Sequence, residues 1–297
     1  KKRQASDEMP RLFPLLEGTA AGRFLKETGA VFWKQTDKGR EAADDRSRKV
    51  RERKGMGKNW KMRMAGLVLA ALIGIGTLLG SGVDAKAAGV IAKGIDVSMY
   101  QEAINWSAVA SEGYSFAFIR VGSAKSGLDP YFAQNMAGAA AAGLKTGVYL
   151  YSYATTVEAA LAEAQFTLAA IAPFTVNMPV VYDLEDAVHK TMSTQELVAL
   201  VVAFCSTIEN AGYYPMVYSN KNMLTTQIGV VPYDVWVAQY ADACDYPNPS
   251  FWQFTSSGTV SGINGRVDLN YQFKDYSNII IANGFTTRNG NTYFYNK

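Results

Sequence analysis

Between residues 88 and 273 the sequence alternates short apolar runs with alanine-rich stretches, most of which run into glycine. The apolar runs predict eight strands, at 94–98, 116–122, 146–153, 179–185, 214–219, 235–240, 251–255 and 267–273. The stretches between them predict helices at 106–111, 131–142, 156–172 and 194–211, the last opening with the capping box Ser193-x-x-Glu196. This alternation favours parallel strands joined by crossover helices. Since the helices shrink in the final third, we expect an α/β fold, a modified TIM-like barrel with eight strands.

A run without charged residues, 65–83, divides the chain. Lys58, Lys61 and Arg63 precede it and the small-x-small site Ala85-x-Ala87 follows, as in a secretory signal peptide. Its length also suits an uncleaved membrane anchor, which remains the alternative. We therefore divide the chain into 1–55, a basic segment that is untranslated or disordered if translation starts at Met56; 56–87, a signal peptide or anchor; 88–273, the barrel; and 274–297.

The charges are distributed unevenly on the two sides of this run. Residues 1–63 carry 18 basic and 9 acidic side chains, whereas residues 88–297 carry 10 basic and 16 acidic ones, so the net charge of +3 is an average of two unlike parts. The basic stretch 46–54 has no interleaved aromatic residues, and we expect no nucleic-acid partner. Two cysteines and one histidine exclude a disulfide scaffold and most histidine-based metal catalysis, and we expect no metal or cofactor.

Four acidic residues, Asp96, Asp183, Glu185 and Asp268, fall at the C-terminal ends of predicted strands. In a parallel barrel these ends form the catalytic face, so strands one, four and eight would direct the four carboxyl groups into one mouth. Asp183 and Glu185 are two residues apart and share a face. Buried charges are costly unless they are paired or functional, so the alternative is an ion-pair network, with Arg120 and Arg266 as the nearest partners.

Clustered carboxylates suit either glycoside hydrolysis or a hard-metal site. Aromatic residues in or after the same strands favour sugar, because flat rings stack against sugar rings, although some of these side chains must fill the core. The residues we expect to contact substrate are Tyr100, Tyr149, Tyr151, Tyr153, Tyr218, Trp236, Gln239, Tyr240 and Trp252.

Residues 94–273 resemble the family 25 glycoside hydrolases, the lysozyme-like muramidases. The resemblance is carried, in order, by Gly94-Ile-Asp-Val-Ser98, Phe118-Ile-Arg-Val-Gly122, Gly147-Val-Tyr-Leu-Tyr-Ser-Tyr153, Val181-Tyr-Asp-Leu-Glu185, Val217-Tyr-Ser-Asn220, Trp236-Val-Ala-Gln-Tyr240, Trp252-Gln-Phe-Thr255 and Val267-Asp-Leu-Asn270. It implies a modified eight-stranded barrel that cleaves, without metal, the β-1,4 bond between N-acetylmuramic acid and N-acetylglucosamine in peptidoglycan. Carried onto this chain, it makes Glu185 the general acid and Asp183 its companion, with Asp96 and Asp268 completing the cleft floor.

Two other functions stay open at this stage. A non-catalytic wall-binding module would keep the aromatic cleft without the proton chemistry. A chitinase-like N-acetylhexosaminidase also has Asp-x-Glu after a barrel strand, but its longer motif has aspartates where this chain has Met178 and Val181. We expect a monomer that is secreted and associated with the cell wall, or anchored in the membrane facing outward if 65–83 is not cleaved.

Two smaller features complete the sequence. Residues 283–297 resemble one choline-binding-type cell-wall repeat after a linker, in a chain that continues beyond Lys297; the alternative is a further barrel strand. His189 is expected in a surface loop.

Overall fold

The computed structural model describes residues 89–281, 284–288 and 291–295. The expectations for residues 1–55 and 56–87 therefore lie outside the described residues. In the described part of the chain, no helix has the length and hydrophobicity that crossing a bilayer requires.

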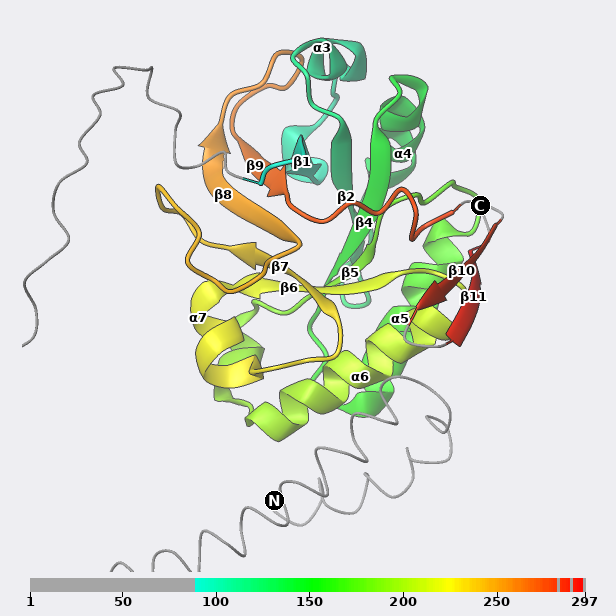
Figure 1. Ribbon diagram of the computed structural model, residues 1–297, viewed down its shortest axis with the longest axis vertical. Helices are drawn as coiled ribbons and strands as arrows, with labels where there is room; N and C mark the ends of the chain where they lie inside the picture. Colours follow the sequence, from blue (N-terminus) through cyan, green and yellow to red (C-terminus); the bar gives the residue numbers. More distant parts are fainter. Residues whose placement is uncertain (1–88, 282–283, 289–290, 296–297) are drawn as a thin grey trace, which may run out of the picture. The chain divides into compact units, whose positions relative to one another are not determined.

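Eight strands close into a barrel, which confirms the predicted fold class (Figure 1). Their bounds are β1 (Ala92–Val97), β2 (Phe116–Ser123), β4 (Lys145–Tyr151), β5 (Val180–Asp183), β6 (Pro215–Asn220), β7 (Asp234–Ala238), β8 (Phe251–Gly258) and β9 (Val267–Gln272). The order β1-β9-β8-β7-β6-β5-β4-β2 is closed by pairing of β1 with β2. The two-residue strand β3 (Gly127–Leu128) extends the sheet beside β2.

Strand direction departs from the prediction at one position. Each pair from β1–β2 through β7–β8 is parallel, but β9 is antiparallel to both β8 and β1. Only residues 259–266 connect β8 to β9. A parallel return needs a crossover of roughly a dozen residues or more, so this short connection makes the last strand reverse.

Four helices follow the early strands as the sequence predicts. They are α3 (Trp106–Ser111), α4 (Phe132–Ala141), α5 (Val157–Ile171) and α6 (Thr194–Asn210). Shorter turns are η3 (Met99–Gln101), η4 (Ala187–Thr191), α7 (Lys221–Met223) and the π-helical η5 (Leu224–Ile228). The predicted capping box at Ser193 is present, and α5 and α6 pack against each other (Figure 1).

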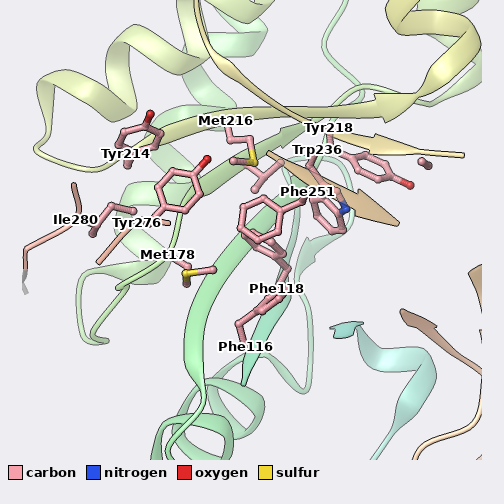
Figure 2. Close-up of a cluster of buried hydrophobic side chains, with 12 residues drawn as sticks. Phe116, Phe118, Met178, Tyr214, Met216, Tyr218, Trp236, Phe251, Tyr276 and Ile280 are labelled. Carbon is pink, nitrogen blue, oxygen red and sulfur yellow. The ribbon is translucent and has the colours of Figure 1, made fainter. Parts of the chain in front are cut away.

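The barrel interior is filled by aromatic rings (Figure 2). Phe118 stacks on Trp236 with ring centroids 4.6 Å apart and meets Phe251 edge-on at 5.0 Å. Glycine faces these rings: a Cβ on Gly147 would lie 2.4 Å from the Phe118 ring. Because alternate residues of a strand share a face, the interior face of β2 that carries Phe118 also carries Arg120 toward the mouth.

The barrel core extends beyond Phe273, contrary to the expectation of a linker from Lys274 onward. Tyr276 is 1% exposed, stacks on Phe251 and lies with Ile280 at one end of the aromatic cluster (Figure 2). Its hydroxyl and the Lys274 ammonium both donate to Asp234 Oδ2, at 2.7 and 2.6 Å. Tyr276 and Ile280 anchor this segment in the core, and Ile279 packs against the same cluster.

The last two described strands, β10 (Gly284–Arg288) and β11 (Asn291–Tyr295), form a separate antiparallel sheet. They pair with each other, so the alternative of a further barrel strand is wrong. The identity of this hairpin as a choline-binding-type repeat stays a prediction.

Candidate active site

A cleft of about 200 Å³ opens at the end of the barrel where the parallel strands finish. All four predicted carboxyl residues line it: Asp96, Asp183, Glu185 and Asp268. Five of the predicted substrate residues join them, namely Tyr100, Tyr149, Tyr151, Tyr218 and Trp236. The structure thus brings together, in one cavity, side chains spread over more than 170 positions of sequence.

The strands supply these carboxyl groups in two ways. Asp96 and Asp183 lie near the ends of β1 and β5, and Glu185 follows two residues after Asp183. Asp268 lies at the start of β9, not at the end of a parallel strand as the sequence analysis expected. Because β9 runs antiparallel, its start reaches the same mouth, and Asp268 is directly opposite Asp96 in the β1–β9 register.

Burial divides the four carboxyl groups into two deep and two accessible ones. Asp96 and Asp183 are 4% and 2% exposed, whereas Glu185 and Asp268 are half-buried. Desolvation is the main cause that raises the pKa of each of the four above its ordinary value, and for Asp96 and Asp183 the pKa rises far. Negative charge on Asp268 raises the pKa of Glu185 further, and Glu185 does the same to Asp183.

One cation faces this cluster in the cleft lining that the structure describes. The Arg120 guanidinium lies 5.2 Å from the centre of the Tyr151 ring and lowers the pKa of Asp183 and Glu185 less than burial raises it. Arg266 is exposed on the loop before β9 and is not part of the lining. A neutralising ion-pair network, the alternative left open by the sequence, would need more positive charge than Arg120 supplies.

Asp96 is held by two amide side chains that the sequence analysis missed as site residues. Its Oδ2 accepts hydrogen bonds from Asn270 Nδ2 at 2.7 Å and Gln253 Nε2 at 2.9 Å. The period-two pattern could have found Asn270, since it shares a strand face with Asp268, and Gln253, which continues the inward face of Phe251.

The predicted aromatic residues differ in their exposure and in whether they line the cleft. Tyr100 is 73% exposed at the mouth, whereas Tyr218 and Trp236 are buried with only part of their surface on the cleft. Tyr240 is exposed and is not part of the lining, and its hydroxyl group donates to Gln253 Oε1 at 2.9 Å. Tyr153 lies outside the lining, where its ring contacts Tyr151 and the Lys125 ammonium.

Two predicted substrate residues, Trp252 and Gln239, make contacts within the protein and are not part of the cleft lining. Trp252 is 1% exposed, donates to the Gln239 carbonyl and packs against Phe254 and Tyr271, so its rings have no free face for a sugar. The Gln239 side chain bonds to its own loop, at Ala243 and Asp245. Sequence position at the end of β7 or in β8 could not distinguish these outward directions from inward ones.

The loop after β5 holds the one histidine, and the expectation of a surface position is wrong. His189 is fully buried, with Nε2 3.0 Å from the Ala154 carbonyl oxygen, and burial lowers its pKa. Asp186 is the N-cap of η4, as expected of a cap residue, and also accepts a hydrogen bond from the Tyr151 hydroxyl. These contacts connect the β4 and β5 sides of the mouth.

The choice between metal and sugar chemistry can be examined on the same side chains. Within the described residues, no group of three or more His, Cys, Asp or Glu side chains has an arrangement that could hold a metal ion. The arrangement suits proton transfer, because it combines an accessible carboxyl group of raised pKa with deeper carboxyl groups beside it.

Known proteins of similar sequence include a lysozyme. Lysozyme M1 of Streptomyces globisporus is 27% identical over 226 residues, which cover 67% of this chain and 76% of that protein. The protein YegX of Escherichia coli K12 is 32% identical over 188 residues, covering 60% of this chain and 68% of its own length.

Among solved structures, the modular autolysin LytC of Streptococcus pneumoniae superposes with a TM-score of 0.55 at 30% identity. The match covers 61% of this chain but only 46% of LytC, so this chain spans less than half of that protein. The sequence model of the glycosyl hydrolases family 25 matches residues 95–263, which is more than half of the chain and includes Asp96, Asp183 and Glu185. The chain therefore belongs to glycosyl hydrolase family 25.

Proposed function

We propose that this protein is a muramidase that hydrolyses the β-1,4 bond between N-acetylmuramic acid and N-acetylglucosamine in peptidoglycan. The observation that carries the proposal is the convergence of four carboxyl groups and one arginine in a single cleft that the exposed Tyr100 and three further tyrosines also line. Relatives support the substrate: two carry the names Lysozyme M1 and Autolytic lysozyme, and LytC has been solved with a synthetic peptidoglycan ligand.

Glu185 is the general acid in this proposal. It is half-buried, so it can touch the glycosidic oxygen, and its raised pKa keeps it protonated at a higher pH than an ordinary glutamate. A protonated carboxyl group can donate its proton to the leaving oxygen as the bond breaks. The oxocarbenium-like charge that develops on the sugar is then stabilised by the negative potential of the neighbouring carboxylates.

Asp183 is its companion. Its Oδ1 is buried and makes no hydrogen bond within the described part of the chain, and Asp183 lines the cleft. A buried acceptor without a partner costs free energy that a substrate N–H group can recover. We assign this oxygen to the acetamide of the substrate, which it would orient against the reacting carbon. Tyr100 and Tyr151 would stack on sugar rings along the wall.

The site of action follows from the substrate. Peptidoglycan lies outside the cytoplasmic membrane, which agrees with the export signal predicted at 56–87. We propose action at the cell wall by a monomer, after cleavage of that segment or from a membrane anchor if 65–83 stays attached. The hairpin β10–β11 would add wall affinity if it is a choline-binding-type repeat.

The test is hydrolysis of purified peptidoglycan by the full chain and by Glu185→Gln. Loss of a general acid lowers the rate by about 10²–10⁴-fold. Glu158→Gln is the matched control, since Glu158 is exposed in the first turn of α5 and is not part of the cleft lining. Activity of Glu185→Gln equal to that of the control would refute the assignment.

Product analysis separates this proposal from the two alternatives. A muramidase leaves N-acetylmuramic acid at the new reducing ends, and borohydride reduction converts it to muramicitol. A chitinase-like enzyme would instead release N-acetylglucosamine ends and cleave chitin oligosaccharides. A non-catalytic wall-binding module would sediment with the wall and create no reducing ends at all.

A further inference from the structure

The hairpin between β2 and β3 places a lysine beside the cleft. β2 ends at the mouth, and Ser123 pairs with Gly127 across the turn that carries Lys125. The backbone of this hairpin is tightly packed: Gly122 has a φ of +129°, and a Cβ on it would lie 2.2 Å from the Gly127 carbonyl oxygen. The Ser123 hydroxyl group also accepts a hydrogen bond from the Ser126 N–H at 2.9 Å. The fold therefore fixes the backbone at Lys125 beside the mouth.

Lys125 lies at the end of a row of rings that begins inside the cleft. The Arg120 guanidinium is 5.2 Å from the centre of the Tyr151 ring, and both residues line the cleft. The centre of the Tyr153 ring is 5.1 Å from that of Tyr151, and the Lys125 ammonium is 4.6 Å from the centre of the Tyr153 ring. A cation at this distance is attracted to the face of the ring. Two cations thus bracket two rings, one cation inside the cleft and the other just outside it.

The Lys125 ammonium is available to a ligand. Its side chain is exposed, and among the described residues its one contact of this kind is the Tyr153 ring, with no ion pair. An ammonium group has three N–H donors, so contact with one ring leaves donors for a carboxylate. Arg120, by contrast, faces the carboxyl groups of Asp183 and Glu185. Lys125 is therefore a cation that the proposed proton chemistry does not use.

The charge of the enzyme and of its proposed substrate gives this lysine a role. Four carboxyl groups line the cleft beside one arginine, and residues 88–297 carry 16 acidic and 10 basic side chains. Peptidoglycan is itself anionic, because the lactyl groups of its muramic acid residues carry stem peptides with free carboxylates. An acidic cleft repels such a polymer. A cation beside the cleft offsets this repulsion at the place where a substrate carboxylate is bound.

We propose that Lys125, held on the Tyr153 ring, forms an anion subsite beside the cleft that binds a carboxylate of the substrate. This inference rests on the proposed muramidase function and extends it from the cleaved bond to the substituent on the muramic acid. The ammonium donates to the carboxylate, and no covalent bond is formed or broken. The carboxylate belongs to the stem peptide or, where the peptide has been removed, to the lactyl group itself, and both offer the same chemistry.

Three soluble substrates separate these sources. They are uncross-linked peptidoglycan strands with their stem peptides, the same strands with every carboxylate converted to a neutral amide by carbodiimide and ammonia, and strands from which an amidase has removed the peptides. KM and kcat are measured for wild type and for Lys125→Met, which keeps an unbranched side chain over the Tyr153 ring. We expect Lys125→Met to raise KM about 2- to 5-fold on the strands that carry the bound carboxylate, as for an exposed ion pair, and to leave kcat unchanged. On amidated strands the two proteins should have the same KM.

Two further variants serve as controls. Lys125→Arg keeps the charge and should restore KM. Lys145→Met is the matched control, because Lys145 is also an exposed lysine but lies at the start of β4, at the opposite end of the barrel. A purely structural role for Lys125 would change KM on all three substrates alike, and a lysine that contacts no substrate would change none of them. Either result overturns the subsite.

A binding measurement keeps the subsite and the muramidase function apart. The dissociation constant of the strands with stem peptides and of the strands without them is measured by titration calorimetry on Glu185→Gln, alone and combined with Lys125→Met, so that hydrolysis does not interfere. If wild type cleaves no strands but Lys125→Met still weakens binding about 2- to 5-fold, the subsite is supported and the muramidase function is refuted. Strands that bind both proteins with the same affinity, or bind neither, overturn the subsite and leave the function to be decided by cleavage alone.

Discussion

Replacing Asp183 by asparagine should stabilise the protein while it abolishes activity. The carboxyl group is 2% exposed, its Oδ1 has no hydrogen-bond partner within the described residues, and Glu185, Asp96 and Asp186 add like charge. Burial is the main cause that raises its pKa well above the ordinary value, and the charge of Arg120 offsets this only in part. Asparagine has nearly the same shape without a charge. We expect a gain of about 1–3 kcal/mol at pH 8, the usual cost of a buried unsatisfied polar group.

The pH dependence of this gain has a definite sign. A carboxyl group whose pKa is higher in the folded chain than in the unfolded one binds more protons when folded. Its stabilising contribution is complete below the unfolded pKa of about 3.9 and is lost as the pH rises through the folded pKa. Asparagine does not titrate, so the advantage of Asp183→Asn should be small near pH 4 and grow toward pH 8.

Urea unfolding of both proteins between pH 4 and pH 8 measures this difference. Asp186→Asn is the control, because the Asp186 carboxylate already accepts hydrogen bonds from the Val188 N–H and the Tyr151 hydroxyl. That variant should be no more stable than wild type at any pH in the range. An Asp183→Asn variant whose stability equals or falls below that of wild type throughout would show that the buried carboxyl group is compensated, and the reasoning would fail.

Three further predictions concern the aromatic residues and one glycine. Tyr100→Ala should raise KM about 2- to 12-fold through loss of sugar stacking, with little change in Tm. Trp252→Ala should instead lower the free energy of unfolding by about 3–5 kcal/mol, because its indole is buried. The reverse pattern in kinetics and thermal unfolding would contradict the assignment of Tyr100 to the cleft and of Trp252 to the core. Tyr276→Phe should lower the free energy of unfolding by about 1.5–3 kcal/mol through loss of the hydrogen bond to Asp234 and leave kcat unchanged, and unaltered urea unfolding would show that this hydrogen bond does not hold the segment after β9 in place. Gly147→Ala should destabilise by about 1–3 kcal/mol, since its Cβ would overlap the Phe118 ring, so a variant of normal stability would mean that the barrel interior is less tightly packed than the structure shows.

The sequence predicted the barrel well because its strands follow a strong local rule. Runs such as 116–122 and 214–219 are apolar on both faces, and glycines after α4 and α6 mark the helix ends. The reversal of β9 could have been inferred from the shortness of 259–266, but the same Val-Asp-Leu-Asn run fits either direction. Direction depends on the connection between strands, which residue patterns inside a strand do not encode.

The charged residues of the site could be predicted from the sequence, and its neutral residues could be predicted less well. Carboxyl groups in apolar strands are conspicuous because burial penalises them, so Asp96, Asp183 and Asp268 stand out without a structure. Gln253 and Asn270 carry no charge, and their role depends on which partners they meet across strands. Trp236 lines the cleft and Trp252 does not, although the two look alike in sequence. Side-chain direction at the ends of strands decided these cases.

Because Asp96 lies opposite Asp268 in the β1–β9 register, the site is complete only when the barrel has closed. One residue belongs to the first barrel strand and the other to the last, and they meet only after β9 has inserted between β8 and β1. The same insertion delivers Asn270, so a chain that lacks β9 has neither the charge beside Glu185 nor the amide beside Asp96. With the proposed site residues, an unfinished or unfolded chain should be inactive, and the appearance of hydrolytic activity during refolding would report the closing of the barrel in real time.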